Sequence, residues 1–476
     1  MASEGGSKLR PFPVEITDAI IDATAELAFT SPTQSDARAH RKSLLSFHAT
    51  STDCHRRALV HLFNRISLPL IGGQGRHRLA SLRELLNSPT SPRMGLDLVR
   101  YIKDVELKFS TAVRKNTRFP YGSQNAFSVE RVINDENVAL FLHQLHGDGY
   151  GIEKLTLAVD SDDSSGGWWI ITKGVDWTNL SSHFRLAFQN LLQSPYLAWL
   201  DVRNFIYLPY ELFRGSKVTS LTWNLDKNIV IPPAWSYQAD ASSVPDLNHT
   251  LSMEYPQIEY LDTNCLHRLP DTAACASVKG LKTLCVGSLA GNVPPTVSSN
   301  LLRLCGGSLK MLGLEFSGPL HFEIPDISSI PNLEVFAVTQ SQLQSSPNTI
   351  PVQNIEPLAQ LLNAQNPMRS LAEVHLYLTI AAAGAIRVAH PAWRAIDEAL
   401  ASVDVYPALC VVKVYVTFMV TVVYRADFSS KDFEEETRRY LEAQFVGCKG
   451  RERVELVLDF ECDVEALEGD YNPACF

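Results

Sequence analysis

The sequence predicts an α/β protein, with a short N-terminal helical segment followed by an irregular solenoid of strand and helix units that share a parallel sheet. Three observations support this prediction. Apolar residues near the N-terminus recur at helical spacing. The rest of the chain repeats one strand-like apolar pattern many times, and segments with helical spacing stand between some of the copies. A chain of 476 residues is long enough for one small domain and an elongated array.

The first expected helix begins near Phe12. Pro13 suits the first helical position because its missing N–H would have no partner there, and Glu15 suits the helix dipole in the first turn. One apolar stripe then follows at helical period, made of Ile16, Ile20, Ala23 and Leu27. Either this stripe packs on the domain behind it, as a helical cap would, or it binds another protein.

The N-terminal segment resembles an F-box. The resemblance rests on Phe-Pro-Val-Glu-Ile at 12–16, the apolar run Leu44-Leu45-Ser46-Phe47, the pair Arg56-Arg57, and the run from His61 to Ile66. The family usually begins with Leu-Pro-x-Glu-Leu and has a Trp before the basic pair. Here Phe12 replaces the Leu and no Trp lies between positions 47 and 56. The segment is thus similar to the degenerate F-boxes of fungal F-box proteins with leucine-rich-like repeats.

The resemblance implies a substrate-recognition subunit of a cullin–RING (SCF-type) ubiquitin ligase. In that family the box docks on a Skp-type adaptor, the repeats bind a target protein, and a separate conjugating enzyme does the chemistry. The adaptor-binding residues are expected among the apolar residues of the opening helices, namely Phe12, Pro13, Ile16, Ile20, Leu44 and Leu45. The alternative is a non-catalytic interaction scaffold that has lost adaptor binding.

A strand pattern organises the remainder of the chain: apolar, two residues, apolar, one residue, apolar. Copies that begin at 197, 218, 258, 281, 309 and 333 lie 21, 40, 23, 28 and 24 residues apart, and most of these steps match the period of leucine-rich repeats. Helical spacing at 183–193 and 355–362 predicts right-handed crossovers and a parallel sheet lining a curved solenoid. A doubly wound α/β domain is the alternative, since the periods are irregular and the Asn ladder of many leucine-rich repeats is missing.

The expected segments are a helical box at 10–68, a connection containing Gly, Ser and Pro at 69–95, the array at 96–461 and a tail at 462–476. A last helix from Lys431 to Phe445 has its acidic residues early and its arginines late, which suits the helix dipole. This helix and a strand at 454–460 are expected to close the array. The tracts 161–167 and 232–245 are expected to be insert loops.

The strands are also expected to bind the target. If Leu200 and Val202 point inward, the alternate positions of each strand face outward. Aromatic and Arg side chains are common anchors of protein interfaces. The expected target-binding residues are Trp199, Asp201 and Arg203, then Tyr260, Asp262 and Asn264, then Glu373, His375 and Tyr377. The alternative is that these positions are only the solvated side of the sheet.

Composition excludes several other classes of protein. A net charge of −10 argues against binding nucleic acid through the field of the whole chain. The longest apolar stretch, 409–424, contains Lys413 and is too short and too β-branched for a membrane span. Nine widely spread cysteines and an N-terminus without an apolar signal predict reduced thiols and a cytoplasmic or nuclear protein.

No motif predicts catalysis. Phosphate-binding loops, nucleophile elbows and zinc-binding helices are missing from the sequence. Residues 160–163 begin like a calcium loop, but Ser165 stands where the turn needs Gly and Ile171 where a bidentate Glu is required. We therefore expect no enzyme activity, no cofactor and no metal site.

Overall fold

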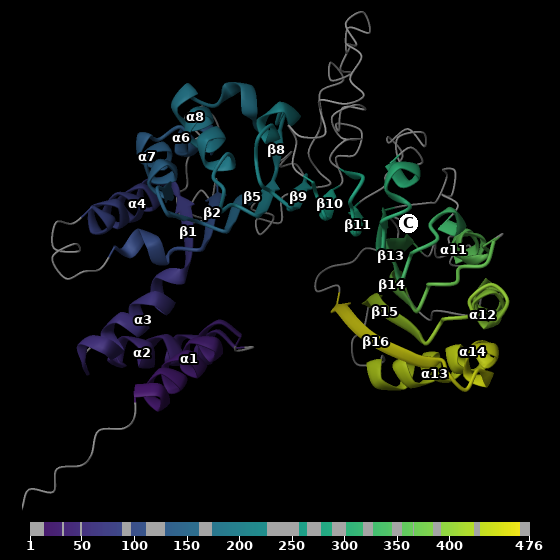
Figure 1. Ribbon diagram of the computed structural model, residues 1–476. Coiled ribbons are helices and arrows are strands. Elements are labelled where there is room, and N and C mark those ends of the chain that lie inside the picture. The colour runs from purple at the N-terminus through teal and green to yellow at the C-terminus, as the bar shows by residue number, and fades with distance from the viewer. Residues whose placement is uncertain are drawn as a thin grey trace, which may run out of the picture. The chain divides into compact units, whose positions relative to one another are not determined.

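The computed structural model describes residues 14–30, 33–47, 50–87, 97–110, 129–160, 174–225, 257–263, 278–287, 301–317, 327–344, 355–364, 366–383, 392–422 and 429–466. It is a mixed α/β protein whose long strands pair in parallel (Figure 1). The chain divides into two compact units, one of residues 1–217 with 228–230 and one of residues 218–227 with 231–476. This division falls inside the array expected at 96–461.

Three helices form the start of the first unit: α1 (Val14–Thr30), α2 (Gln34–Phe47) and α3 (Thr52–Asn64). They contact one another around a small core of Ile21, Ala25, Ala28 and Leu44. The side chain of Ser51 accepts a hydrogen bond from the N–H of Cys54 and so caps α3. The helix expected near Phe12 is therefore present from Val14 onward, and Phe12 and Pro13 lie outside the described residues.

The first unit also contains a parallel sheet in the order β1 (Arg65–Ile71), β2 (Asp104–Ser110), β5 (Lys154–Asp160), β7 (Trp199–Arg203). Strand β1 follows α3 directly, and α4 (Gly72–Leu86) follows β1. The expected boundary at residue 68, between a helical box and a connection at 69–95, is therefore wrong, because β1 runs across it and α4 occupies 72–86. Ile66, Leu68 and Leu70 alternate as in a strand, and Pro69, which suggested a break, is tolerated because β1 pairs on one side only among the described strands.

The first unit has these further described elements: η1 (Leu98–Tyr101), α6 (Val129–Ile133), α7 (Glu136–Gln144), β3 (His146–Gly147), β4 (Tyr150–Gly151), β6 (Val175–Asp176), η3 (Trp177–Asn179), α8 (Ser182–Leu192), β8 (Phe205–Ile206) and η4 (Tyr210–Phe213). Helix α8 confirms the helix expected at 183–193. Its Phe184 and Phe188 rings are stacked, and both contact Trp177 edge-on. These aromatic side chains are buried and form the core beneath α8.

The second unit contains eight described strands that neighbour one another in chain order: β9 (Ser220–Asn224), β10 (Tyr260–Thr263), β11 (Thr283–Val286), β12 (Met311–Ser317), β13 (Val335–Gln344), β14 (Glu373–Ala383), β15 (Val411–Val422) and β16 (Glu455–Ala466). Every neighbouring pair is parallel. The parallel sheet predicted from the apolar pattern is thus confirmed. The strand expected at 454–460 is β16, and the apolar stretch 409–424 is β15.

Helices between these strands are η8 (Ile327–Ser329), α11 (Ile355–Leu362), α12 (Ala392–Ala401), α13 (Ser430–Gln444) and α14 (Val446–Gly450). Helix α11 matches the helix expected at 355–362, and α13 matches the expected last helix. Helices α11, α12 and α14 lie on one side of strands β13 to β16 (Figure 1). The expected insert loops at 161–167 and 232–245 lie outside the described residues.

One row of buried apolar side chains crosses the sheet of the second unit in register: Leu221, Leu261, Leu284, Leu312, Phe336, Val374 and Val412. Burial of each such side chain contributes roughly 1.5 to 3 kcal/mol before the entropic cost of folding. A one-residue slip of any strand would turn its apolar residues to the opposite face. The row therefore fixes the register of the sheet and confirms the inward alternation expected from the sequence.

A buried carboxylate joins two helices of the second unit. Asp397 of α12 is 4% exposed and accepts hydrogen bonds from the backbone N–H groups of Gly447 and Cys448, at 2.7 and 2.8 Å. A Cβ atom on Gly447 would lie 2.7 Å from the Cβ of Ala401. Glycine at this position therefore allows the first turn of α14 to approach α12 closely enough for Asp397 to bind it.

We predict that Asp397→Ala lowers the free energy of unfolding of the second unit by about 2 to 4 kcal/mol, because it leaves two backbone donors without an acceptor. Urea unfolding followed by circular dichroism measures this loss. Glu398→Ala is the matched control, since Glu398 is 66% exposed and bonds only to Arg394 on the same helix, and it should change stability by less than about 0.5 kcal/mol. Equal effects of the two substitutions would show that Asp397 does not hold α14.

Candidate docking surfaces

Helix α1 exposes an apolar face. Ile16, Ile20 and Leu27 are 47%, 49% and 48% exposed, and Leu45 on α2 is 57% exposed. Ile16, Ile20 and Leu27 belong to the stripe found in the sequence, whereas the core of the three helices is made by Ile21, Ala25 and Ala28. Within the described residues, therefore, the stripe does not serve as the packing face of the helix. We call Ile16, Ile20 and Leu27, taken together with Leu45 of the contacting helix α2, the α1 apolar face.

The residues expected to bind an adaptor are placed differently from one another. Ile16, Ile20 and Leu45 lie on the α1 apolar face, while Phe12 and Pro13 lie outside the described residues. Leu44 is fully buried in the core of the three helices. Neighbouring residues of a helix point about 100° apart, so Leu44 and Leu45 cannot share one face. The expectation that Leu44 faces a partner is therefore wrong for this arrangement of the helices.

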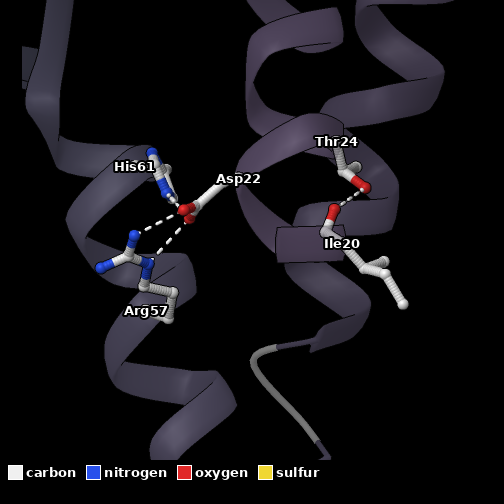
Figure 2. Close-up of polar contacts among 5 residues, drawn as sticks. All are labelled: Ile20, Asp22, Thr24, Arg57 and His61. Carbon is white, nitrogen blue, oxygen red and sulfur yellow. Dashed lines mark hydrogen bonds and ion pairs between the residues drawn. The ribbon is translucent and has the colours of Figure 1, made fainter. Parts of the chain in front are cut away.

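A polar cluster joins α1 to α3. Asp22 accepts hydrogen bonds from Nε and Nη2 of Arg57, at 2.7 and 2.5 Å, and lies 2.7 Å from Nε2 of His61 (Figure 2). Arg57 and His61 are four residues apart on α3, so both side chains reach the same point. Figure 2 shows the side chain of Ile20 pointing away from this cluster. The cluster therefore holds one side of α1 against α3, while the exposed apolar side chains of α1 lie on a different side of the helix.

The hydrogen bonds from Arg57 lower the pKa of Asp22 to about 2, and the pairing with His61 acts in the same direction. The same contact raises the pKa of Arg57. Sequence reasoning noted Arg57 and His61 as part of a motif but did not assign this role. The spacing of four residues on α3 was a usable signal, whereas the identity of the partner depends on how α1 and α3 pack.

On the sheet of the first unit, Trp199 is 41% exposed and Nζ of Lys154 lies 4.6 Å from the centre of its ring. Leu200 and Val202 are buried, so the predicted strand parity is confirmed at β7. Asp201 is nevertheless buried, because exposed Arg203 covers it through two hydrogen bonds of 3.0 and 2.7 Å. Trp199 and Arg203 are thus the accessible members of this predicted trio.

In the second unit, Tyr377 is 38% exposed and its ring stacks on that of Tyr415, with 4.9 Å between centres and 3° between planes. His375 lies 2.8 Å from a carboxylate oxygen of Glu373, and Nζ of Lys413 lies 3.8 Å from the same oxygen. These contacts bring together the predicted Glu373, His375 and Tyr377. Tyr260 and Asp262 on β10 are half-buried, and Asn264 lies outside the described residues.

Sequence reasoning missed Tyr415 and Lys413. The signal was present in the sequence, because two further copies of the apolar pattern begin at Leu371 and Leu409. Aligning these two copies places Tyr377 beside Tyr415 and His375 beside Lys413. The strand register confirms both pairs.

Cys285 faces the same side of the sheet as Asp262 and Gly313, but burial raises the pKa of its thiol to about 11. At neutral pH this thiol is protonated and is a poor nucleophile. Among the described residues, no group of three or more His, Cys, Asp or Glu side chains is placed to hold a metal ion. No helix in the described part of the chain has the length and apolar character needed to cross a membrane.

No protein-family model matches the sequence, and no curated protein matches it either.

We predict that Asp22 stabilises the contact of α1 with α3 in a pH-dependent way. The folded pKa of about 2 lies below the ordinary value of 3.8, so the contribution is fully present above pH 3.8 and is lost as pH falls toward 2. The difference in melting temperature between the wild type and Asp22→Asn should therefore be present at pH 5 and shrink on acidification. Melting followed by circular dichroism measures it.

Asp18→Asn is the control for this pH dependence. Asp18 lies one turn away on α1 and influences Arg57 only through its charge. A pH-dependent difference of the same size for Asp18→Asn would mean that net charge, not the Asp22 cluster, is responsible.

Proposed function

We propose that this protein is a substrate-recognition subunit of a cullin–RING ubiquitin ligase of the SCF type, in which the N-terminal helices dock on a Skp-type adaptor. The observation that supports this most directly is the α1 apolar face. Helices α1 and α2 already share a closed core, so their packing does not require the exposed Ile16, Ile20 and Leu27 on α1 or the exposed Leu45 on α2. Such a face is typical of a surface that binds a partner protein.

The size of the face fits this proposal. Full burial of an apolar side chain contributes roughly 1.5 to 3 kcal/mol, and a micromolar complex needs about 8 kcal/mol beyond the entropic cost of association. Ile16, Ile20, Leu27 and Leu45 are already about half buried, so covering them adds roughly half of that amount each and supplies only part of a micromolar affinity. The resemblance to an F-box also assigns Phe12 and Pro13 to adaptor binding, and in this proposal they extend the contact with the adaptor.

We further propose that the strands form a leucine-rich-like array that holds a target. The chain-order arrangement from β9 to β16 supports an array, because a doubly wound sheet reverses its strand order at a switch point. Such a protein needs no catalytic residue, since holding a target near a conjugating enzyme raises the effective concentration of the target. Its place of action would be the cytoplasm or the nucleus, where free cysteines such as Cys305 and Cys448 stay reduced.

The alternative is an interaction scaffold that no longer binds the adaptor. It is favoured by the departures from the family pattern at Phe12 and at positions 47 to 56, where Cys54 and His55 stand and no Trp does. Cys54 packs against the core of the three helices. In the scaffold alternative the α1 apolar face binds a different protein.

We predict that Ile16→Asp combined with Leu45→Asp abolishes recovery of the Skp-type adaptor in a pull-down, because two exposed apolar contacts are replaced by charges that must be desolvated. Both residues are about half exposed, so folding should be preserved. Val403→Asp is the control, as Val403 is 58% exposed in the second unit and lies outside the proposed contact. If the wild type itself never recovers the adaptor, the ligase proposal fails and the scaffold alternative replaces it.

We also predict that Trp199→Ala and Tyr377→Ala each weaken binding of a target, identified by proximity labelling, by about 1 to 3 kcal/mol, because exposed aromatic rings are common interface anchors. Leu186→Ala is the matched control, since Leu186 is 54% exposed on α8. Titration calorimetry measures affinity and circular dichroism measures melting, which should hardly change. Unaltered binding in both variants would place the target elsewhere, on loops or helices.

A further inference from the structure

The outward face of the second unit has an uneven charge distribution. Beside the first residues of its strands, cations and carboxylates are matched: Lys282 bonds to Glu259 at 2.9 Å and Lys310 to Glu334 at 2.7 Å. Lys413 is the one Lys or Arg among the outward residues of the described strands β9 to β16, and it lies beside Glu373. Outward cations are therefore already balanced by neighbouring carboxylates.

The balance is lost toward the carboxyl ends of β15 and β16. Asp459 is the register partner of Tyr415, and Glu461 is the register partner of Thr417. Both carboxylates are exposed, and neither forms an ion pair with any described residue. Asp459 accepts one hydrogen bond, from the backbone N–H of Phe460. We call Tyr377, Tyr415, Asp459 and Glu461 the tyrosine–carboxylate patch.

The strand register places the tyrosine rings beside these carboxylates. The separation of 4.9 Å between the ring centres is close to the spacing of neighbouring strands, about 4.8 Å, and the planes are parallel. The rings therefore stack across β14 and β15. The stack covers Tyr415 from the β14 side, and on its other side the neighbouring strand is β16, where Asp459 is its register partner. A cation placed there would contact the ring face and the carboxylate together.

The other side of β16 is already occupied. Arg438 of α13 lies over the ring of Phe460 at 4.9 Å and donates a hydrogen bond to the carbonyl of Leu458. Leu458 and Phe460 alternate with Asp459 and Glu461, so the helix covers one side and the carboxylates lie on the opposite one. On its covered side, β16 therefore has an arginine of the same chain, Arg438, over the ring of Phe460. On its outward side, the ring of Tyr415 and the carboxylate of Asp459 could bind an arginine of a partner in a similar way.

We infer that the tyrosine–carboxylate patch binds a positively charged, extended segment of the target protein, with an Arg or Lys side chain between Tyr415 and Asp459. The proposed function enters this inference only where the bound segment is said to belong to a target protein of the ligase. Charge complementarity selects this occupant, since unpaired carboxylates favour a cation and repel the phosphates of nucleic acid. Aromatic faces favour an arginine, whose planar guanidinium stacks on them.

The test uses the full-length chain without an adaptor and a fluorescein-labelled Gly/Ser peptide of about twelve residues with arginine at every third position. Fluorescence anisotropy should show binding with a Kd below about 1 mM that weakens as salt is raised, whereas a peptide with glutamine in place of arginine should not bind. Equal binding of the two peptides would overturn the inference.

Variants locate the site. Asp459→Asn and Tyr415→Leu should each weaken binding of the arginine peptide by about 5- to 10-fold, and Tyr415→Phe should keep it, because the ring remains. Glu455→Gln is the matched control: it removes one carboxylate from the same strand and the same side, about 13 Å from Asp459, and should change affinity less than about 2-fold. Equal losses for Glu455→Gln and Asp459→Asn would reduce the effect to net charge and overturn the inference.

Melting of each variant separates binding from folding. If Tyr415→Leu lowers the melting temperature, its loss of binding cannot be assigned to the site. Asp459→Asn then provides the test, because Asp459 is exposed and its substitution leaves the stacked tyrosine rings intact. The result is also independent of adaptor docking: failure of peptide binding leaves the α1 apolar face untouched, and failure of the adaptor pull-down leaves this patch in place.

Discussion

The register of the parallel strands is the constraint on which the second unit depends. Leu284, Leu312 and Phe336 lie side by side in one buried row because each strand enters the sheet at the same point of its apolar pattern. The outward residues are then placed automatically, since side chains alternate along a strand. Tyr377 meets Tyr415, and Tyr415 meets Asp459, for the same reason that the core rows align. Core packing thus determines which functional groups become neighbours.

In the N-terminal helices, too, the packing of the core determines which side chains are exposed, but the residues on one face recur at helical spacing instead of alternating. The face of α1 that packs is set by small residues such as Ala25 and Ala28, which allow the helices to approach closely, while larger apolar residues remain outside. Asp22, Arg57 and His61 add a directional contact at one edge of this packing. Apolar burial is not directional, so such a charged contact helps to fix how α1 is rotated about its own axis. That rotation decides which side chains a partner can reach.

The sequence was sufficient wherever the period of the apolar residues was clear. It predicted the parallel sheet, the helices at 183–193 and 355–362, and the inward parity of Leu200 and Val202, because these depend on local patterns. It failed at β1, where a proline and a following glycine run concealed an alternation of three apolar residues. It also failed for Leu44, because periodicity marks which residues are apolar but does not say which of two apolar faces packs inside.

The pairing of charged residues is a second property that the sequence alone does not predict. The net charge of −10 is a property of the whole chain, yet Glu373 forms an ion pair with Lys413, while Asp459 and Glu461 have no ion pair among the described residues. A sum over the sequence cannot separate these cases, because pairing depends on which strands are neighbours. The strand register supplies that information. It shows that the excess negative charge of this face is concentrated at Asp459 and Glu461 on β16. Recognition by this protein is therefore best sought where carboxylates are left unpaired beside an aromatic surface, and not in its overall charge.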